Sequence, residues 1–424
     1  SPRTAKAAPA VSEGDGMLPS AMPSTPDLSV VVVHYRGEEH LRECLESLRG
    51  AAGGVRLETI LVDNGGSAGT DRVLRGYPEV RAVRAGGNVG FARGCRLGAD
   101  AGRAPAVAFV NDDAAVEPDA LEMLAGSLAA APPDVSAVAG RLVDRTGRKN
   151  DFSDGFLTFD GHAFQEDSGR PLDQLRPTHP GEERLFACGG LMAVRRDEFF
   201  TSGGFDDDYF AYLEDVDFGW RQWIRGRRIL SEPRAVARHR GGATGEALGL
   251  YPRGFLIEKN AYATAFKNFD AEHFRALMPA ILGAFTGRIA EMLETRNPDA
   301  RELRRDPYDV PRSVSGSNPW KRLFGISTAA LPDPGDARIS IDDPLTIAHM
   351  RALLWIHRNT ERLAAKRRAV QDSRRRTDAE IFARFPLRIV PTYPGDERFD
   401  GAYFRELLGR APVLVHSTLA EIFA

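Results

Sequence analysis

The sequence has few cysteines and no long apolar run. Its three cysteines, Cys44, Cys95 and Cys188, are odd in number and far apart. This pattern predicts reduced thiols, and neither a disulfide framework nor a zinc site. The most apolar stretch, residues 277–285, soon meets Arg288, whereas crossing a bilayer takes roughly 20 apolar residues. We therefore expect a cytoplasmic chain that does not span a membrane.

The sequence also lacks a strong excess of either charge. The formal net charge is -3 at pH 7, which gives no reason to expect nucleic acid as a partner. Residues 1–26 are rich in Ala, Pro, Ser and Gly and have no apolar segment of a secretory signal, so we expect a disordered leader. The length of 424 residues favours more than one domain. We expect one domain over 27–270 and a mainly helical region over 271–424.

Apolar patterns of strand and helix length alternate in the first part of the chain. Such alternation predicts an α/β fold with a mixed, mostly parallel sheet flanked by helices. The expected strands are 28–33, 57–62, 80–83 and 106–110, and the expected helices are 38–49, 90–101 and 118–131.

Polar residues follow three of the expected strands directly. Parallel strands end at one edge of a sheet, and ligands of open α/β sheets bind there. We therefore expect these side chains to converge on one crevice. They are His34, Tyr35, Asp63, Asn64, Asn111, Asp112 and Asp113.

Two acidic groups are candidates, one for a metal ligand and the other for a general base. Asp113 follows a strand and offers hard oxygen ligands to Mg²⁺ or Mn²⁺, although a helix N-cap or an Asx-turn explains the same residue type. Glu214, Asp215 and Asp217 stand close together among aromatic residues, where a carboxylate with a raised pKa could act as a general base. The alternative is a helix N-terminus that favours acids, with Arg221 pairing with Asp217.

An ordered set of motifs resembles glycosyltransferase family 2, and most closely its rhamnosyltransferase-like and galactofuranosyltransferase-like branch. The resemblance covers about 28–270 and implies a GT-A fold. The matching motifs are Val-Val-Val-Val-His-Tyr, Val62-Asp63-Asn64-Gly65-Gly66-Ser67, Gly87-Asn88-Val89-Gly90-Phe91-Ala92, Asn111-Asp112-Asp113, Cys188-Gly189-Gly190, Gly203-Gly204-Phe205-Asp206 and Glu214-Asp215-Val216-Asp217.

The resemblance implies a role for each matching position. Asp113 and His239 would hold the metal, and Asp215, beside Glu214, would be the catalytic base. The remaining positions would contact the nucleotide-sugar donor; they are His34, Tyr35, Arg36, Asp63, Asn64, Asn88, Phe91, Asn111 and Asp112. Arg36 stands where the family often has Asn, which leaves the identity of the donor open.

A basic run from Arg358 to Arg376 follows the apolar residues 353–356 on an expected helix over 344–375. Three interpretations of this run stay open: a solvated helix face, a peripheral contact with the membrane surface, and a contact in a homo-oligomer. Asp206-Asp207-Asp208 lacks the spacing of a calcium loop and predicts solvated turn residues.

The sequence thus predicts an inverting, metal-dependent glycosyltransferase. The resemblance is compatible with dTDP-rhamnose or a UDP-sugar as donor, and with a glycan or lipid-linked acceptor. Two alternatives stay open. A nucleotidyltransferase would usually have a glycine-rich, basic loop after its first strand, and a non-catalytic sugar-nucleotide-binding protein would not need Asp113 and Asp215.

Overall fold

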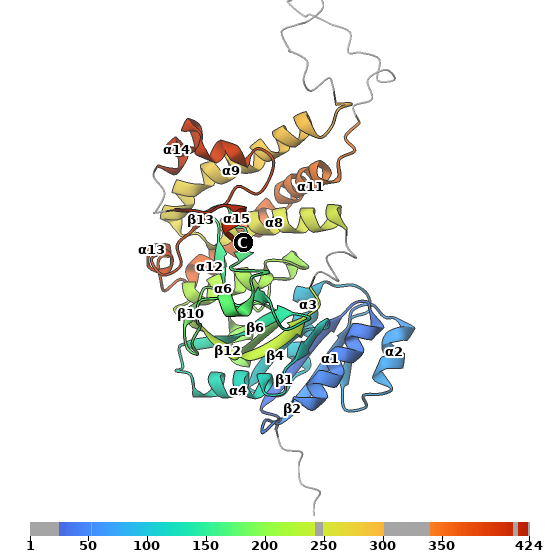
Figure 1. The fold of residues 1–424 in the computed structure, drawn as a ribbon. Coiled ribbons are helices and arrows are strands. Elements are labelled where there is room, and N and C mark those ends of the chain that lie inside the picture. The colour runs from blue at the N-terminus through green and yellow to red at the C-terminus, as the bar shows by residue number, and fades with distance from the viewer. Residues whose placement is uncertain (1–24, 52, 242–248, 301–339, 410–413, 423–424) are drawn as a thin grey trace, which may run out of the picture.

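The computed structural model describes residues 25–51, 53–241, 249–300, 340–409 and 414–422 (Figure 1). The predicted leader lies almost wholly outside these residues. In Figure 1 the sheet lies below, and the helices of the C-terminal region lie above it. This arrangement confirms the predicted fold class, a GT-A-type α/β sheet followed by a mainly helical region.

The sheet is mixed, and half of it is parallel around β1. Strand β1 (Leu28–His34) pairs in parallel with β2 (Leu57–Asp63) and β4 (Ala106–Asn111), and β2 pairs in parallel with β3 (Arg81–Arg84). The strand order is β10-β12-β6-β11-β4-β1-β2-β3. The other half is formed by β6 (Val135–Asp144), β10 (Glu183–Arg184), β11 (Leu191–Arg195) and β12 (Arg228–His239), with β5 (Ala114–Val116) and β7 (Asn150–Phe152) beside them.

Strand β1 is buried along its whole length, as its β-branched run predicts. Val30 and Val32 face the apolar cluster under α1 (Glu38–Gly50) and α4 (Ala120–Ala130). Val31 and Val33 face the opposite cluster, under α3 (Phe91–Ala101) and α5 (Arg196–Thr201). Side chains of a strand alternate between faces, so a run that is apolar throughout belongs between two helical layers.

The parallel register brings the predicted strand ends together. His34 lies opposite Asp63, and Val33 lies opposite Asn111. The polar residues that follow β1, β2 and β4 therefore share one edge of the sheet.

The helical region packs on the sheet domain through α6 (Glu214–Ile224) and α8 (Leu250–Asn268). Along the chain there follow α9 (Ala271–Thr295), α11 (Pro344–Arg358), α12 (Thr360–Asp372), α13 (Asp378–Phe382), α14 (Ala402–Leu408) and α15 (Leu419–Ile422). The shorter elements are α2 (Ala68–Leu74), β8 (Gly155–Leu157), β9 (Ala163–Gln165), β13 (Arg388–Ile389) and β14 (Val415–His416). One apolar core includes residues from both parts of the chain, so the predicted division at residue 270 stays a prediction.

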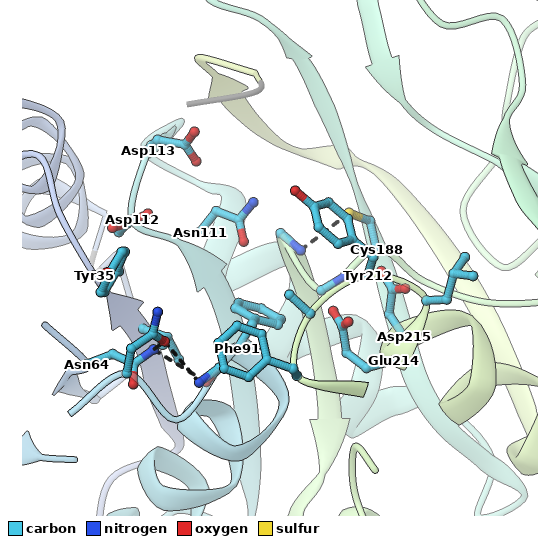
Figure 2. Close-up of a pocket in the computed structure, with 18 of the residues that line it drawn as sticks. Tyr35, Asn64, Phe91, Asn111, Asp112, Asp113, Cys188, Tyr212, Glu214 and Asp215 are labelled. Carbon is cyan, nitrogen blue, oxygen red and sulfur yellow. Dashed lines mark hydrogen bonds between the residues drawn. The ribbon is translucent and has the colours of Figure 1, made fainter. Parts of the chain in front are cut away.

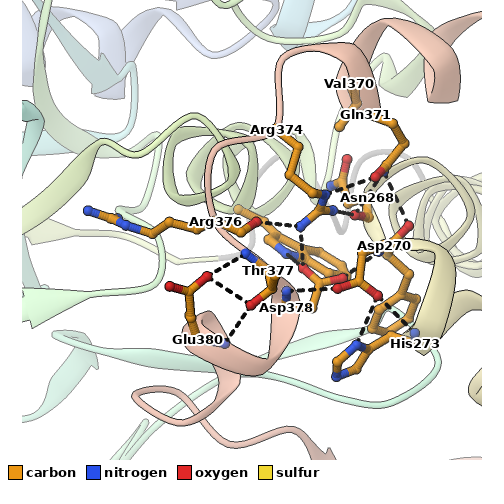
Figure 3. Close-up of polar contacts among 12 residues, drawn as sticks. Asn268, Asp270, His273, Val370, Gln371, Arg374, Arg376, Thr377, Asp378 and Glu380 are labelled. Atoms are coloured by element: carbon orange, nitrogen blue, oxygen red, sulfur yellow. Dashed lines mark hydrogen bonds and ion pairs between the residues drawn. The ribbon is translucent and has the colours of Figure 1, made fainter.

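A buried carboxylate joins α13 to α6 and to the junction between α8 and α9 (Figure 3). Asp378 accepts hydrogen bonds from the Trp220 indole (3.2 Å), from Arg374 (3.0 Å) and from the backbone N–H of Asp270 (2.5 Å). The Asp270 carboxylate in turn accepts the backbone N–H of Asp378 (3.0 Å). The C-terminal helices are thus fixed to the helix that carries the predicted catalytic acids.

The basic run faces inward along much of its length. Arg362 and Lys366 pair with Asp208, Lys366 also pairs with Asp206, and Arg367 donates to the Phe269 carbonyl (2.6 Å). The prediction of solvated turn residues at Asp206 and Asp208 was therefore wrong, because a helix about 160 residues later supplies their counter-charges.

The long helix expected over 344–375 is divided in two. Asn359 separates α11 from α12, and its side-chain amide donates to the Trp355 carbonyl (2.7 Å). Asparagine competes with the helical backbone for hydrogen bonds, which makes it a common residue at a helix end.

Among the described residues, one helix, α9, is long and apolar enough to cross a bilayer by length and composition. The sequence analysis did not anticipate such a helix. Half of its most apolar window is buried within the fold, and Arg288 on α9 pairs with Asp160 (2.9 Å) and Asp396 (2.6 Å). These contacts are those of a core helix.

Candidate functional site

A cavity of about 370 Å³ opens at the carboxyl ends of β1 and β4. In Figure 2 the residues that follow the strands lie on one side and Glu214 and Asp215 on the other. Asp113 and Asp215 therefore line the same cavity, although about 100 residues separate them. The predicted site residues that line it are Tyr35, Asn64, Asn88, Phe91, Asn111, Asp112, Asp113, Glu214, Asp215 and His239.

Three predicted donor contacts are not among the lining residues. His34 is fully buried, and its Nδ1 lies 2.7 Å from Asp112 Oδ2. Asp63 accepts the backbone N–H groups of Gly65 (3.2 Å) and Gly66 (2.8 Å) and pairs with Arg84. Arg36 is exposed, with its guanidinium 4.8 Å from the ring centre of Tyr35. The predicted donor contacts of these three residues are therefore not seen in the cavity lining.

Two asparagines hold the loop that leads into α3. Asn64 donates to the side chain of Asn88 (3.0 Å) and accepts the backbone N–H of Val89 (2.8 Å). Asn88 also accepts the backbone N–H of Gly90 (3.1 Å). Gly90 has φ 85°, and a Cβ there would lie 2.5 Å from the Phe210 carbonyl oxygen, so this close approach requires glycine. Through this contact the loop is joined to the segment that carries Glu214 and Asp215.

Asp113, His239, Asn111 and Asp151 form a compact polar group at one end of the cavity. His239 Nε2 lies 3.1 Å from Asp113 Oδ1 and 3.2 Å from the Asn111 amide, and its Nδ1 lies 2.5 Å from Asp151 Oδ2. Burial lowers the pKa of His239, but the Asp113 and Asp151 carboxylates outweigh it and raise the pKa to about 10. Sequence reasoning missed Asp151, because it lies in a region of weak periodicity.

The donor atoms of this group suit a divalent cation. Asp113 Oδ1 and His239 Nε2 are 3.1 Å apart, which is close to the separation of adjacent ligands in an octahedron with bonds of about 2.1 Å. Asp151 would hold the imidazole from the other side, as carboxylates do behind metal-binding histidines. Asp113 and His239 therefore fit a divalent cation and would be the residues that hold it.

A second group with metal-ligating side chains consists of His34, His40 and Asp112, whose ligand atoms lie within 4.8 Å of one another. Its shortest separation, 2.7 Å between His34 and Asp112, is that of a hydrogen bond. Burial raises the pKa of Asp112, but hydrogen bonds from the two histidines outweigh it and hold the pKa below its usual range. Asp112 is thus turned toward α1, and Asp113 is left as the carboxylate beside His239.

Glu214 and Asp215 begin α6 and line the opposite end of the cavity. Asp215 accepts the backbone N–H groups of Gly189 (2.9 Å) and Val216 (2.8 Å), which fix its carboxylate. Burial raises the pKa of Asp215 despite these hydrogen bonds. Burial, and next the charge of Asp215, raise the pKa of Glu214 to about 8. The pair therefore binds protons more tightly than ordinary carboxylates do.

Asp217 takes no part in the cavity lining. It pairs with Arg221 (2.9 Å), as the structural alternative for this residue predicts, and with Lys267 (3.1 Å).

The segment before Glu214 has an unusual backbone. Phe210, Tyr212 and Leu213 have φ values of 65°, 68° and 64°, a region that residues with side chains seldom adopt. One buried amide holds this segment: Asn260 on α8 donates to the carbonyls of Tyr209 (3.1 Å), Ala211 (2.9 Å) and Tyr212 (2.7 Å). Sequence reasoning attached no contact to Asn260, although a buried Lys-Asn pair within an apolar helix was a signal that could have found it.

The α/β fold, with a cavity at the carboxyl ends of its parallel strands, is the arrangement that the resemblance to glycosyltransferase family 2 predicts. Residues 29–199 match the model of the family described as Glycosyl transferase family 2. This match covers less than half of the chain and agrees with the resemblance carried by the motifs.

Two of the relatives that match parts of this chain act on lipid-linked sugars by their names. N-acetylglucosaminyl-diphospho-decaprenol L-rhamnosyltransferase of Mycobacterium tuberculosis is 28% identical over 240 residues, which are 51% of this chain and 78% of that protein. Glucosyl-dolichyl phosphate glucuronosyltransferase of Haloferax volcanii is 29% identical over 185 residues, 42% of this chain and 56% of that protein. The solved structure of GalNAc-T7 with UDP, GalNAc and Mn²⁺ has a TM-score of 0.47 and 16% identity, over 63% of this chain and 51% of that one. That structural likeness is too distant to bear on the activity.

Proposed function

We propose that this chain is an inverting, metal-dependent glycosyltransferase that transfers a sugar from a nucleoside-diphosphate donor to a hydroxyl of a glycan or lipid-linked acceptor. The observation that carries the proposal is that Asp113 and Asp215 line one cavity from its two ends. Sugar transfer needs both a site for the departing diphosphate and a base for the acceptor hydroxyl.

The reaction we propose is a single displacement. Asp215 takes the proton from the acceptor hydroxyl, whose oxygen forms a bond to the anomeric carbon of the sugar. The bond from that carbon to the diphosphate oxygen breaks at the same time, so the configuration inverts. A cation held by Asp113 and His239 would supply positive charge to the departing nucleoside diphosphate.

The geometry of Asp215 supports its role as the base. Its two hydrogen bonds come from the backbone, which holds the carboxylate rigidly at the cavity wall. Burial raises its pKa toward the pH at which the enzyme would work, and a base is most effective there. Glu214, whose pKa is about 8, would remain largely protonated beside it at neutral pH.

The relatives narrow the substrates that we propose. One is named for rhamnose and a diphospho-decaprenol acceptor, the other for glucuronosyl transfer to glucosyl-dolichyl phosphate. We therefore propose dTDP-rhamnose or a UDP-sugar as donor and a lipid-linked sugar as acceptor, at the cytoplasmic surface of the membrane.

A two-stage experiment tests the proposal. Thermal shift with a panel of nucleotide sugars and Mg²⁺ or Mn²⁺ would identify the donor, because a bound ligand stabilises the folded state. Transfer to synthetic alkyl-linked sugars and sugar diphosphates would then be measured for the wild type, for Asp215→Asn and for the control Asp207→Asn. Asp207 is exposed and seven residues before Glu214.

Asp215→Asn should keep donor binding and lose about 100-fold or more in turnover, as is common when a general base is removed. Equal turnover in Asp215→Asn and Asp207→Asn would refute the assignment of the base. Failure of every donor to bind would refute the proposed function itself.

A further inference from the structure

Arg253 lines the cavity, next to the segment that leads into Glu214 and Asp215. It lies near the start of α8, with its guanidinium carbon 5.9 Å from the ring centre of Tyr212. Tyr212 is two residues before Glu214 and three before Asp215. In the proposed reaction the acceptor hydroxyl meets Asp215, so a cation packed against the segment before Glu214 is a candidate contact for the acceptor.

The Arg253 guanidinium makes no hydrogen bond or ion pair with any residue that the structure describes, and its contact there is with the Tyr212 ring. The two other cations of α8 are both engaged. Lys259 donates to the Asp208 carbonyl (2.5 Å), and Lys267 pairs with Asp206 (2.6 Å). Arg253 thus differs from its helix neighbours in having its hydrogen-bond donors available at a cavity wall.

The cavity is lined mainly by acids, so a cation among them indicates which charge its substrate carries. The acidic residues that line it are Asp112, Asp113, Glu214 and Asp215, and Arg253 is the one lysine or arginine among the described lining residues. A neutral acceptor hydroxyl needs no cation at this end. An acceptor with a negative group does, because carboxylates beside it would otherwise repel it. The planar fork of a guanidinium matches two phosphate oxygens.

An apolar residue stands one turn before Arg253 on the same helix. Leu250 is 57% exposed, and residues three apart lie on one face of a helix. A hydrocarbon chain attached to a phosphate held by Arg253 would pass along this face. A soluble sugar phosphate would make the phosphate contact alone.

We propose that Arg253 binds a phosphate group of the acceptor and so selects phosphate-bearing acceptors. This inference rests on the proposed glycosyl transfer and adds the chemical class of the acceptor to it. Arg253 would determine acceptor specificity and take no part in the bond changes, because the reacting hydroxyl gives its proton to Asp215.

The test compares two acceptors that differ only in phosphate: decyl N-acetylglucosaminyl diphosphate and decyl N-acetylglucosaminide. The ratio of their kcat/KM values is measured for the wild type, Arg253→Gln, Arg253→Lys and the control Arg275→Gln, which removes an exposed arginine of α9. Arg253→Gln should lower the ratio roughly 10- to 100-fold, the effect of losing a charge-assisted hydrogen bond. Arg253→Lys should recover part of it, and Arg275→Gln should leave it as in the wild type.

A chain-free acceptor separates the two sources of phosphate. N-acetylglucosamine 1-phosphate used as well as the decyl diphosphate would identify a soluble phosphate acceptor. A strong preference for the decyl compound that Leu250→Asp abolishes would identify a lipid. Either result supports the phosphate contact.

An unchanged ratio in Arg253→Gln would overturn the inference while leaving the proposed function standing. A second measurement needs no turnover: calorimetric titration of decyl phosphate in the presence of saturating nucleoside diphosphate and Mg²⁺. Equal binding by the wild type, Arg253→Gln and Arg275→Gln would also overturn it. A wild type that binds no nucleotide-sugar donor would instead show that the proposed function is wrong.

Discussion

Replacing Glu214 with Gln should stabilise the fold, and increasingly so as the pH rises. Burial and the neighbouring Asp215 charge raise the pKa of Glu214 from 4.5 to about 8. The folded state therefore keeps a proton that the unfolded chain releases above pH 4.5. Wild-type stability should fall between about pH 4.5 and pH 8 and level off above that range. Glutamine cannot ionise, so the variant lacks this loss.

The size of the effect follows from the same values. The pKa of Glu214 rises from 4.5 to about 8 on folding. At about 1.4 kcal/mol per pH unit, this rise lowers the unfolding free energy of the wild type by at most about 5 kcal/mol at pH 9. Solvent screening reduces the effect little, because Glu214 is 5% exposed and its Oε2 has no hydrogen-bond partner among the described residues. A gain of this size would be a large part of the stability of an ordinary domain.

Urea denaturation at pH 5 and pH 8.5 would measure the effect, with Glu39→Gln on the exposed face of α1 as a control for the loss of a surface carboxylate. We expect the difference in unfolding free energy between Glu214→Gln and the wild type to be small at pH 5 and several kcal/mol in favour of the variant at pH 8.5. The same difference at both pH values would refute the account of Glu214 as a buried, proton-binding acid.

Other predictions concern the metal, the strained segment and the basic run. Asp113→Ala should abolish the dependence of donor binding on Mg²⁺ or Mn²⁺, measured by thermal shift with and without EDTA; a wild-type metal response would contradict the ligand assignment. Asn260→Ala removes hydrogen bonds to three carbonyls. Because the segment that positions Asp215 then loses its support, kcat should fall about 10-fold or more, with a smaller change in donor KM. A lower Tm without a change in kcat would show that Asn260 has a purely structural role. Lys366→Ala should lower Tm and leave sedimentation with anionic vesicles unchanged, since Lys366 pairs with Asp206 and Asp208; reduced vesicle binding at an unchanged Tm would restore the membrane interpretation of the basic run.

Several features of the fold could be predicted because they are written in local patterns. The apolar run 28–33 could be stable only between two helical layers, and the polar residues after β1, β2 and β4 had to share an edge once these strands were parallel. The motif order predicted the family domain that residues 29–199 match.

Local sequence could not decide which way a side chain turns or what it meets. Asp112 and Asp113 are neighbours of the same residue type, yet the first bonds to His34 and the second lies beside His239. Asp206 and Asp208 pair with Lys366 of α12, far along the chain, and Asp206 also pairs with Lys267 of α8.

The sequence by itself determined the sheet, the edge at which the cavity lies and the acids that face it, because hydrophobic periodicity and strand-end chemistry act over a few residues. Only the tertiary structure decided which acid is buried, which carbonyls Asn260 holds and which cation of the cavity wall lacks an ion-pair partner among the described residues. Those properties depend on burial and on partners brought together by long-range packing, and no short stretch of sequence contains either.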